Sequence, residues 1–294
     1  MIYKMKDILK QVKNLEINTK ELVDGIISGN YHSIFNGTGI EFSEIKDYTL
    51  GDDIRTIDWK VTARMNHPFV RKFIEERDLM VYFVLDISGS GSFGNKVEKK
   101  RKAIEIIASF MFSALKNNDN IGVFLVTDKI EKFIPARKGK KHILKSISNL
   151  LSFEPESKKT NLDNSLRSVS KILKKKSVVF VLSDFYSEDF SKSLMFLKKK
   201  HDTIAIRLID KREKDLPDIG YIYLEDPETK EQLLVNTSDK EFRENYRELV
   251  EKNDLYLKQF FKKNKIDFLE IFTSESYIKP LKKFFKIRKF RSVR

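Results

Sequence analysis

From residue 79 onward, short apolar runs alternate with longer amphipathic segments, and this alternation constrains the fold of the chain. The apolar runs cover residues 79–85, 121–126, 178–182, 203–209 and 267–272. Between them, apolar residues recur at helical spacing over residues 97–117, 139–151, 162–174, 188–200 and 240–264. Strands that alternate with helices form parallel sheets with helices on both faces. The sequence predicts an α/β domain over residues 79–275 with a doubly wound, mostly parallel, Rossmann-like sheet.

Further segments flank this domain or are inserted into it. Residues 1–78 form an N-terminal extension. Apolar residues recur at helical spacing over 4–29, whereas the loop-rich stretch over 31–78 shows neither the helical nor the strand period. No Gly/Ser-rich or Pro-rich linker follows it, so we expect the extension to pack onto the α/β domain. Two short apolar segments, 221–225 and 232–235, predict a hairpin inserted near residues 219–235.

Residues 276–294 form a basic C-terminal helix or tail. Its last fourteen residues, 281–294, hold seven Lys and Arg and no acid. The favoured interpretation is a final helix whose apolar side docks on the sheet while its cations stay solvated. The alternative is that the tail binds acidic lipid headgroups at a membrane surface or an acidic face of a partner.

The composition restricts the class of protein. The formal net charge is +14, but outside the tail the lysines are interleaved with acids and no nucleic-acid-reading module accompanies them, so nucleic-acid binding is disfavoured. The absence of Cys excludes disulfides and thiolate chemistry and favours a reducing compartment. No apolar run approaches the ~18 residues of a membrane-spanning helix, and the first residues lack a signal-peptide core. We therefore expect a cytoplasmic protein.

Polar side chains with metal-binding chemistry follow the first predicted strand. Asp86, Ser88 and Ser90 come directly after this strand, with glycines between them that permit a tight turn. In an open parallel sheet, ligands bind beyond the carboxyl ends of the strands. The three side chains offer hard oxygen donors of the kind that Mg²⁺ prefers. The ordinary alternative is a strand-to-helix turn capped by hydroxyl groups.

Two further oxygen donors are predicted at the same edge. Asp184 follows the strand at 178–182, and Thr160 lies in a loop that leads into a helix. With Asp86, Ser88 and Ser90 they make five candidate ligands from three loops. The sequence predicts a site for Mg²⁺, or for Mn²⁺ or Ca²⁺ in its place.

This pattern resembles the metal-ion-dependent adhesion site (MIDAS) of von Willebrand factor A domains. The resemblance implies that Asp86, Ser88, Ser90, Thr160 and Asp184 hold Mg²⁺, and that an open coordination position accepts an acidic side chain of a protein partner. It implies adhesion through the metal and not turnover. The threonine loop, residues 159–162, reads Lys-Thr-Asn-Leu where such domains commonly have Gly-Thr-Asp-Leu.

A more specific resemblance covers most of the chain. The signature of the DUF58 family is matched at residues 39–44, 47–59, 63–64, 69–73, 75–77, 93–94, 137–139 and 217–220. Bacterial members of this family typically resemble partners of MoxR-type AAA+ ATPases. The resemblance implies a Mg²⁺-dependent adaptor that binds such an ATPase, or other von Willebrand A-like proteins, in the assembly or remodelling of protein complexes. Residues 31–78 would brace the domain or add partner surface.

The alternative interpretation is that the protein is an enzyme. An Asp at a strand end, such as Asp86, can attack phosphorus in a Mg²⁺-dependent phosphatase or hydrolase. Phosphatases of the haloacid-dehalogenase type have a motif of the form DxD, in which the second Asp is the general acid. This chain has Ser88 at that second position. The sequence also has neither a GxSxG elbow nor a P-loop. A non-enzymatic adaptor is therefore favoured.

Other polar and aromatic residues receive structural interpretations. The acids Glu41, Glu44, Asp52, Asp53 and Asp58 suggest a second metal or nuclease site, but pairing with neighbouring cations is favoured, the candidates being Arg55, Lys60, Arg64 and Arg71. Trp59 is expected to pack under a loop, with a role as a partner anchor as the alternative. His142 and His201 lie beside lysines and are expected to face solvent.

Overall fold

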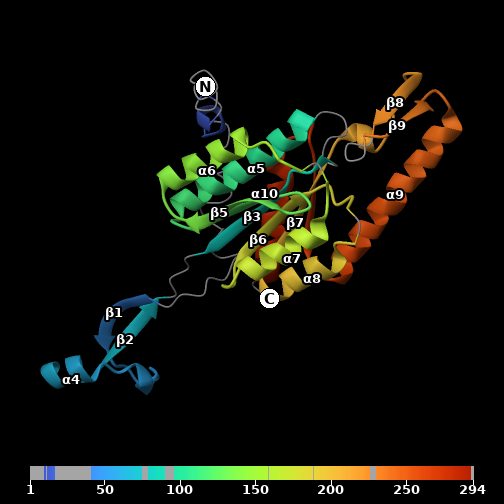
Figure 1. The fold of residues 1–294 in the computed structure, drawn as a ribbon. Coiled ribbons are helices and arrows are strands. Elements are labelled where there is room, and N and C mark those ends of the chain that lie inside the picture. The colour runs from blue at the N-terminus through green and yellow to red at the C-terminus, as the bar shows by residue number, and fades with distance from the viewer. Residues whose placement is uncertain are drawn as a thin grey trace.

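The computed structural model describes residues 10, 12–16, 41–74, 79–89, 96–157, 159–187, 189–225 and 230–292. In these residues the central sheet has six strands in the order β10-β7-β6-β3-β4-β5 (Figure 1). They are β3 (Met80–Asp86), β4 (Asn120–Val126), β5 (Ile130–Arg137), β6 (Val178–Ser183), β7 (Asp202–Ile209) and β10 (Asp267–Phe272). All run parallel except β5, which pairs antiparallel with β4 at one edge. The mostly parallel α/β architecture is confirmed.

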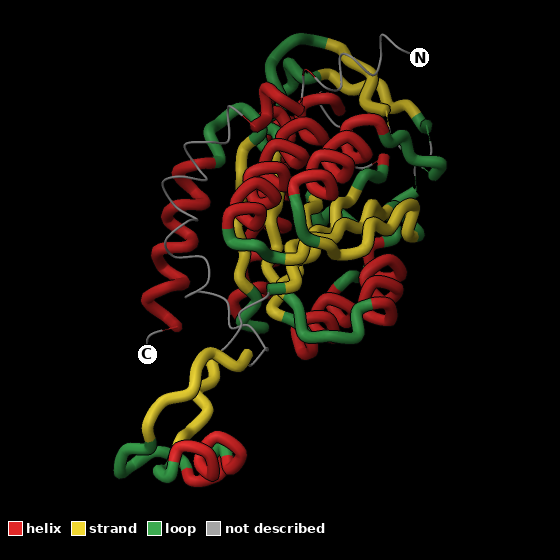
Figure 2. The backbone as a smooth tube through the Cα atoms, turned by 90° about the vertical axis from the view of Figure 1, so that its left-hand side faces the viewer, coloured by secondary structure: helices red, strands yellow, loops and turns green. Residues whose placement is uncertain are grey.

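Helices cover both faces of this sheet. They are α5 (Lys96–Lys116), α6 (Lys140–Ser152), α7 (Leu162–Ile172), α8 (Ser191–Lys200), α9 (Lys240–Lys263) and α10 (Ile278–Ser292). Alternate strand residues point to opposite faces. Phe83 and Leu85 therefore join one core with α5, α6 and α10, whereas Tyr82 and Val84 join a second core with α7, α8 and α9. Figure 2 shows the sheet between these helical layers.

The periodicity did not predict strand β5. Its residues, IEKFIPAR, follow no regular alternation, and in the structure only Ile134 of the strand is buried. An edge strand with one exposed face gives a weaker hydrophobic signal than the buried strands β3 and β6. The predicted hairpin is confirmed as β8 (Tyr221–Glu225) paired antiparallel with β9 (Gln232–Asn236).

Residues 41–74 correct the prediction of a loop-rich stretch. They contain the antiparallel pair β1 (Glu41–Asp47) and β2 (Phe69–Ile74), with the 3-10 turn η2 (Ile54–Thr56) and helix α4 (Trp59–Met65) between the strands. Figures 1 and 2 show this β1–β2 unit apart from the six-stranded sheet. Of the predicted helical segment 4–29, only residues 10 and 12–16 are described, and there Val12 and Leu15 are buried in the first core.

Three acids of the β1–β2 unit are used structurally. Asp58 accepts from Arg71 Nε at 2.8 Å and caps the start of α4. Asp52 pairs with Lys46 Nζ at 2.7 Å, and Asp53 caps η2. The expected pairing with Arg71 therefore holds for Asp58, whereas Asp52 pairs with Lys46, which was not among the predicted cations. The side chains of Glu41 and Glu44 lie outside the described residues.

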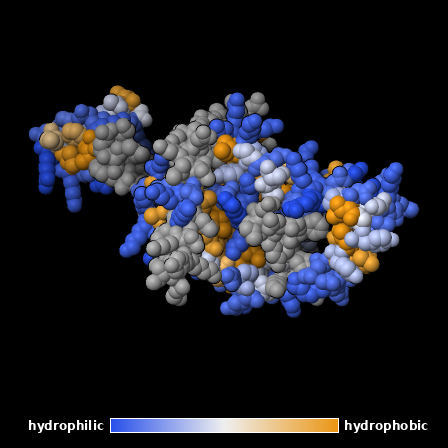
Figure 3. Space-filling view, turned by 90° about the horizontal axis from the view of Figure 1, so that it is seen from above, coloured by the Kyte–Doolittle hydropathy of each residue, from blue (hydrophilic) through white to orange (hydrophobic). Residues whose placement is uncertain are grey.

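Several large apolar side chains are exposed in two regions. Trp59 is 69% exposed, so the expectation that it packs under a loop is wrong. Leu50 and Ile54 of the same unit are exposed, as are Tyr223 and Leu233 of the β8–β9 hairpin. Figure 3 shows apolar surface at both ends of the molecule. None of the helices in the described ranges is both long enough and apolar enough to span a bilayer.

The C-terminal helix α10 docks on the sheet, as the favoured interpretation of the tail predicts. Leu281 and Phe285 are buried in the first core, and the ring of Phe285 meets that of Phe110 edge-on at 5.7 Å. Arg288 closes the contact with ion pairs to Asp202 and to Asp267, the latter at 2.6 Å. The helix is thus an integral part of the α/β domain.

Replacing Phe285 with Ala should lower the free energy of unfolding by about 3–5 kcal/mol, because it leaves a cavity under α10. The control Lys286→Ala alters an exposed neighbour on the same helix and should change it by less than about 0.5 kcal/mol. Urea unfolding followed by circular dichroism measures both. Equal midpoints for Phe285→Ala and the wild-type protein would contradict the docking of α10.

Candidate functional site

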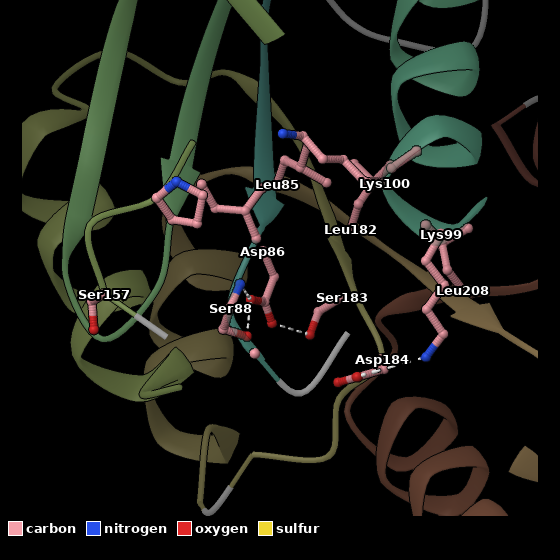
Figure 4. Close-up of a pocket in the computed structure, with 14 residues that line it drawn as sticks. Leu85, Asp86, Ser88, Lys99, Lys100, Ser157, Leu182, Ser183, Asp184 and Leu208 are labelled. Atoms are coloured by element: carbon pink, nitrogen blue, oxygen red, sulfur yellow. Dashed lines mark hydrogen bonds and ion pairs between the residues drawn. The ribbon is translucent and has the colours of Figure 1, made fainter. Parts of the chain in front are cut away.

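The candidate site lies where the order of the strands reverses. The chain leaves β3 through α5 and enters β4 on one side, whereas β6 lies on the other side of β3. Loops that diverge from neighbouring strands leave a crevice at their carboxyl ends, which is where ligands bind in open α/β sheets. A cavity of about 320 Å³ occupies this position. Its lining includes Asp86, Ser88, Lys99, Ser183 and Asp184 (Figure 4).

Hydroxyl groups from two strand ends fix the carboxylate of Asp86. Its Oδ1 atom accepts from the main-chain N–H of Ser88 at 3.0 Å and from the Ser88 hydroxyl at 2.6 Å. Its Oδ2 atom accepts from the Ser183 hydroxyl at 2.7 Å. The Ser183 hydroxyl in turn accepts from the N–H of Phe185 at 3.0 Å. Asp86 is therefore held in one orientation from both β3 and β6.

A left-handed residue directs the chain after Asp184. Phe185 has φ = 58°, a conformation that a bulky side chain adopts at a cost of about 1–3 kcal/mol. Its ring is 2% exposed and packs in the second core against Phe190 and Phe261, which offsets that cost. The turn is completed by the Tyr186 N–H, which donates to Asp184 Oδ1 at 3.2 Å. Burial of Phe185 thus positions the Asp184 carboxylate at the cavity.

A buried arginine supports the same turn. Arg207 of β7 is fully buried, and its Nε donates to the main-chain carbonyl of Asp184 at 3.1 Å. Its remaining donors reach Asp254 at 2.5 Å, Glu270 at 3.2 Å and the Tyr186 hydroxyl at 3.1 Å. A buried guanidinium with acids and carbonyls around it is stable because its charge and its donors are both satisfied.

A buried lysine lies on the other side of Asp184. Lys99 is 5% exposed and forms an ion pair with Glu213. Its ammonium is 3.9 Å from Asp184 Oδ2, an atom that is buried and accepts no hydrogen bond from the described residues. Glu213 is held in place by a capping box with Asp210 at the 3-10 turn over residues 211–213. The ammonium of Lys99 thus lies between Asp184, which lines the cavity, and Glu213, which does not.

The two acids of the cavity influence each other. Burial of the Asp86 carboxyl, together with the negative charge of Asp184, raises its pKa from 3.8 to about 6. The hydrogen bonds from Ser88 and Ser183 oppose this shift without cancelling it. Burial likewise raises the pKa of Glu213, against the effect of Lys99. The surroundings of Asp86 thus destabilise its ionised form, and a nearby positive charge would stabilise that form.

The oxygen atoms of this cavity fit a small divalent cation. Asp86 and Asp184 supply carboxylates, Ser88 and Ser183 supply hydroxyls, and all four are hard donors. The Asp184 Oδ2 atom, which accepts no hydrogen bond from the part of the chain that the structure describes, is suited to ligation, although Lys99 competes for it. No cluster of three or more His, Asp or Glu side chains suited to a metal occurs in the described part of the chain. A cation here would depend on the hydroxyl groups.

Sequence comparison identifies the family. Residues 44–255 match the family described as "Protein of unknown function DUF58". The chain belongs to this family. It is 29% identical over 223 residues to the uncharacterized protein Rv1480 of Mycobacterium tuberculosis, across 74% of this chain and 70% of the relative. It is 23% identical over 135 residues to the uncharacterized protein YeaD of Bacillus subtilis, across 46% of this chain and 31% of the relative.

A solved structure is also similar to this DUF58 chain. It is the crystal structure of the conserved hypothetical protein BatB from Bacteroides thetaiotaomicron, with 14% identity and a TM-score of 0.45. The match covers 71% of this chain and 98% of that one.

The structure brings together three of the five predicted ligands. Asp86, Ser88 and Asp184 line the cavity, Thr160 is not among the residues that line it, and Ser90 lies outside the described residues. Sequence reasoning missed Ser183, although it directly precedes Asp184 at the end of a buried strand. It also missed Lys99, because a lysine in the segment KVEKKRK carries no signal that distinguishes it from solvated neighbours.

The raised pKa of Asp86 predicts a pH-dependent effect on stability. The folded protein binds the Asp86 proton more tightly than the unfolded chain does, so this contribution is fully present below pH 3.8 and is lost as the pH rises through about 6. Asp86→Asn removes the ionisation. In the absence of divalent cations, it should raise the free energy of unfolding at pH 8 by about 1–3 kcal/mol.

Urea unfolding of both proteins at pH 8 and at pH 4 measures this effect. The difference between them should be much smaller at pH 4, where Asp86 is protonated in the folded wild-type protein and only partly ionised in the unfolded chain. An Asp86→Asn variant less stable than the wild-type protein at pH 8 would show that the carboxylate is not destabilised.

Proposed function

We propose that this DUF58 protein is a non-enzymatic adaptor that binds partner proteins through a divalent cation held by its α/β domain, in the manner of a von Willebrand A domain. One observation carries the proposal. The carboxylates of Asp86 and Asp184 come from neighbouring strand ends, face one cavity with hydroxyl groups, and are close enough for each charge to act on the other.

A bound cation accounts for this arrangement. Within the described residues Asp86 forms no ion pair, and the only cation paired with Asp184 is Lys99, at 3.9 Å. Two buried carboxylates repel each other unless a proton or a cation lies near them. Serine hydroxyls complete a donor set without adding further negative charge, which suits a doubly charged ion.

Asp86, Ser88, Ser90, Thr160 and Asp184 are the ligands that the MIDAS resemblance implies, for Mg²⁺ or for Mn²⁺ or Ca²⁺. Ser183 and Phe185 act on the site indirectly, because they hold the carboxylates of Asp86 and Asp184 in place. When bound, the cation supplies an electrophilic position that accepts an acidic side chain of a partner protein. The cavity opens at the carboxyl end of the sheet, where loops present such a position to a partner.

The resemblance of bacterial DUF58 proteins to partners of MoxR-type AAA+ ATPases supports a partner of that class, or another von Willebrand A-like protein. The role would be in the assembly or remodelling of protein complexes, in the cytoplasm. The exposed Trp59 of the β1–β2 unit supports the view that residues 31–78 add partner surface, because exposed aromatics often anchor protein interfaces.

Capture of a MoxR-type ATPase on the immobilised protein tests the proposal. Capture should occur in millimolar Mg²⁺ and be lost in chelator. Asp184→Asn, and Asp86→Ala combined with Ser88→Ala, should reduce capture in Mg²⁺ at least to the level in chelator. The matched control is Glu251→Gln, which removes one exposed carboxylate from α9 and should leave capture unchanged.

Metal binding is measured separately, by the shift in melting temperature that Mg²⁺ causes in the adaptor alone. A shift in the wild-type protein that disappears in Asp184→Asn supports the cation site, whichever partner binds. Capture that is equally strong in chelator and in Mg²⁺ would overturn the adhesion mechanism. The same would follow if Asp184→Asn captured the ATPase as well as the wild-type protein does.

A further inference from the structure

A basic groove lies between α7 and α8, away from the acidic cavity. It has a volume of about 760 Å³. Its lining includes His201, which directly precedes strand β7, and residues of the segment that leads into β6. Its lining includes the six basic side chains Arg167, Lys171, Lys174, Lys176, Lys192 and Lys200. The groove therefore lies toward the amino ends of β6 and β7, whereas Asp86 and Asp184 follow the carboxyl ends of their strands.

Most of this positive charge is not neutralised by the protein. Arg167 is paired with Asp163 at 2.7 Å on the same helix. The five lysines of the groove form no ion pair with any residue that the structure describes. Like charges gathered around one groove repel one another, and an anion between them relieves that repulsion.

Two buried polar side chains also line the groove. His201 is 4% exposed and Ser170 is 1% exposed. Neither the two ring nitrogens of His201 nor the hydroxyl of Ser170 has a hydrogen-bond partner among the described residues. Buried polar atoms are nearly always hydrogen-bonded in folded proteins. Unpaired donors at the base of a cationic groove indicate a ligand that accepts hydrogen bonds. The expectation that His201 faces solvent is wrong.

The helix dipole alone does not explain the lysines of the groove. Cations in the last turn of a helix are favoured by the helix dipole, and α7 and α8 both end near this groove. Each helix end carries roughly −0.5 of an elementary charge, so the two ends together offset about one of the five unpaired lysines. The dipole also gives no reason for the unpaired His201 and Ser170.

We propose that this groove binds the phosphoryl group of a small phosphorylated molecule. The lysines supply the charge, and the Ser170 hydroxyl and one His201 N–H donate to phosphoryl oxygens. Burial and the neighbouring Lys200 hold the pKa of His201 below its usual value, so that the ring is neutral and keeps one donor. Binding does not depend on the cation site or on the adaptor role.

The size and the walls of the groove favour a small molecule over a polymer. Small-ligand sites have volumes of about 300–1,000 Å³, and this groove falls within that range. Phe196 is 49% exposed on its wall, with Lys200 Nζ 4.4 Å from the ring centroid. Its ring offers an apolar surface to the organic part of the ligand. The unpaired polar atoms of His201 and Ser170 are buried within this one groove, whereas a nucleic-acid polymer is met by charges spread along a surface.

Isothermal titration calorimetry of the full chain in chelator, with inorganic pyrophosphate and with ADP, tests this assignment. Lys174→Glu should weaken binding of both probes by about tenfold or more, because it reverses a charge within the groove. Ser170→Ala should weaken binding severalfold without changing the charge. The matched control is Lys199→Glu, the same charge reversal on an exposed residue of α8 outside the groove, which should have little effect.

Lys174 and Lys199 are both exposed, so both variants should fold, and their melting temperatures verify this. Equal affinities for the two probes would assign recognition to the phosphoryl groups alone, and tighter binding of ADP would add Phe196 as a contact. Absence of heat with both probes would overturn the proposal. It would also fall if Lys199→Glu weakened binding as much as Lys174→Glu, or if only a single-stranded RNA oligonucleotide bound.

Discussion

The pairing of β3 with β6 is the interaction on which the candidate site depends. The two strands are parallel and in register, with Leu85 opposite Leu182, so the next residue of each strand, Asp86 and Ser183, lie side by side. These residues are 97 positions apart in the sequence and share a hydrogen bond of 2.7 Å. Both strands are buried on both faces, so a shift in their register would expose apolar residues of two cores. The packing of the whole domain therefore fixes the geometry of the site.

Several locally unfavourable features gather at this edge of the sheet. Asp86 has a raised pKa, Phe185 adopts a left-handed conformation, and Lys99 shares its charge between two buried acids. Contacts outside the cavity stabilise the turn after β6: the Phe185 ring packs in the second core, and Arg207 donates to the main-chain carbonyl of Asp184. Strain and shifted pKa values of this kind cluster at functional sites more often than in purely structural regions. This edge of the sheet thus combines features that are typical of functional sites.

The sequence predicted the α/β domain closely because the buried apolar residues of its strands and helices recur at regular spacing. The predicted helix at 97–117 is α5 at Lys96–Lys116, and the one at 240–264 is α9 at Lys240–Lys263. The β1–β2 unit and β5 were missed because their strands mix charged and apolar residues without a regular period, as loops do. Asp86 and Asp184 were found because strand ends are visible in the sequence. Lys99 was not, because its acidic neighbours are remote in the chain and the fold alone brings them together.

The basic excess of the composition also has a different meaning in three dimensions. In the sequence, the lysines of α7, of α8 and of the segment after α7 resemble a solvated face, since no pattern there separates a dispersed charge from a convergent one. The structure places five of these lysines around one groove, which His201 and Ser170 also line. In a parallel sheet the loops at the two ends of the strands are independent of each other. One end can therefore gather carboxylates and the other cations, and substitutions at one need not disturb binding at the other.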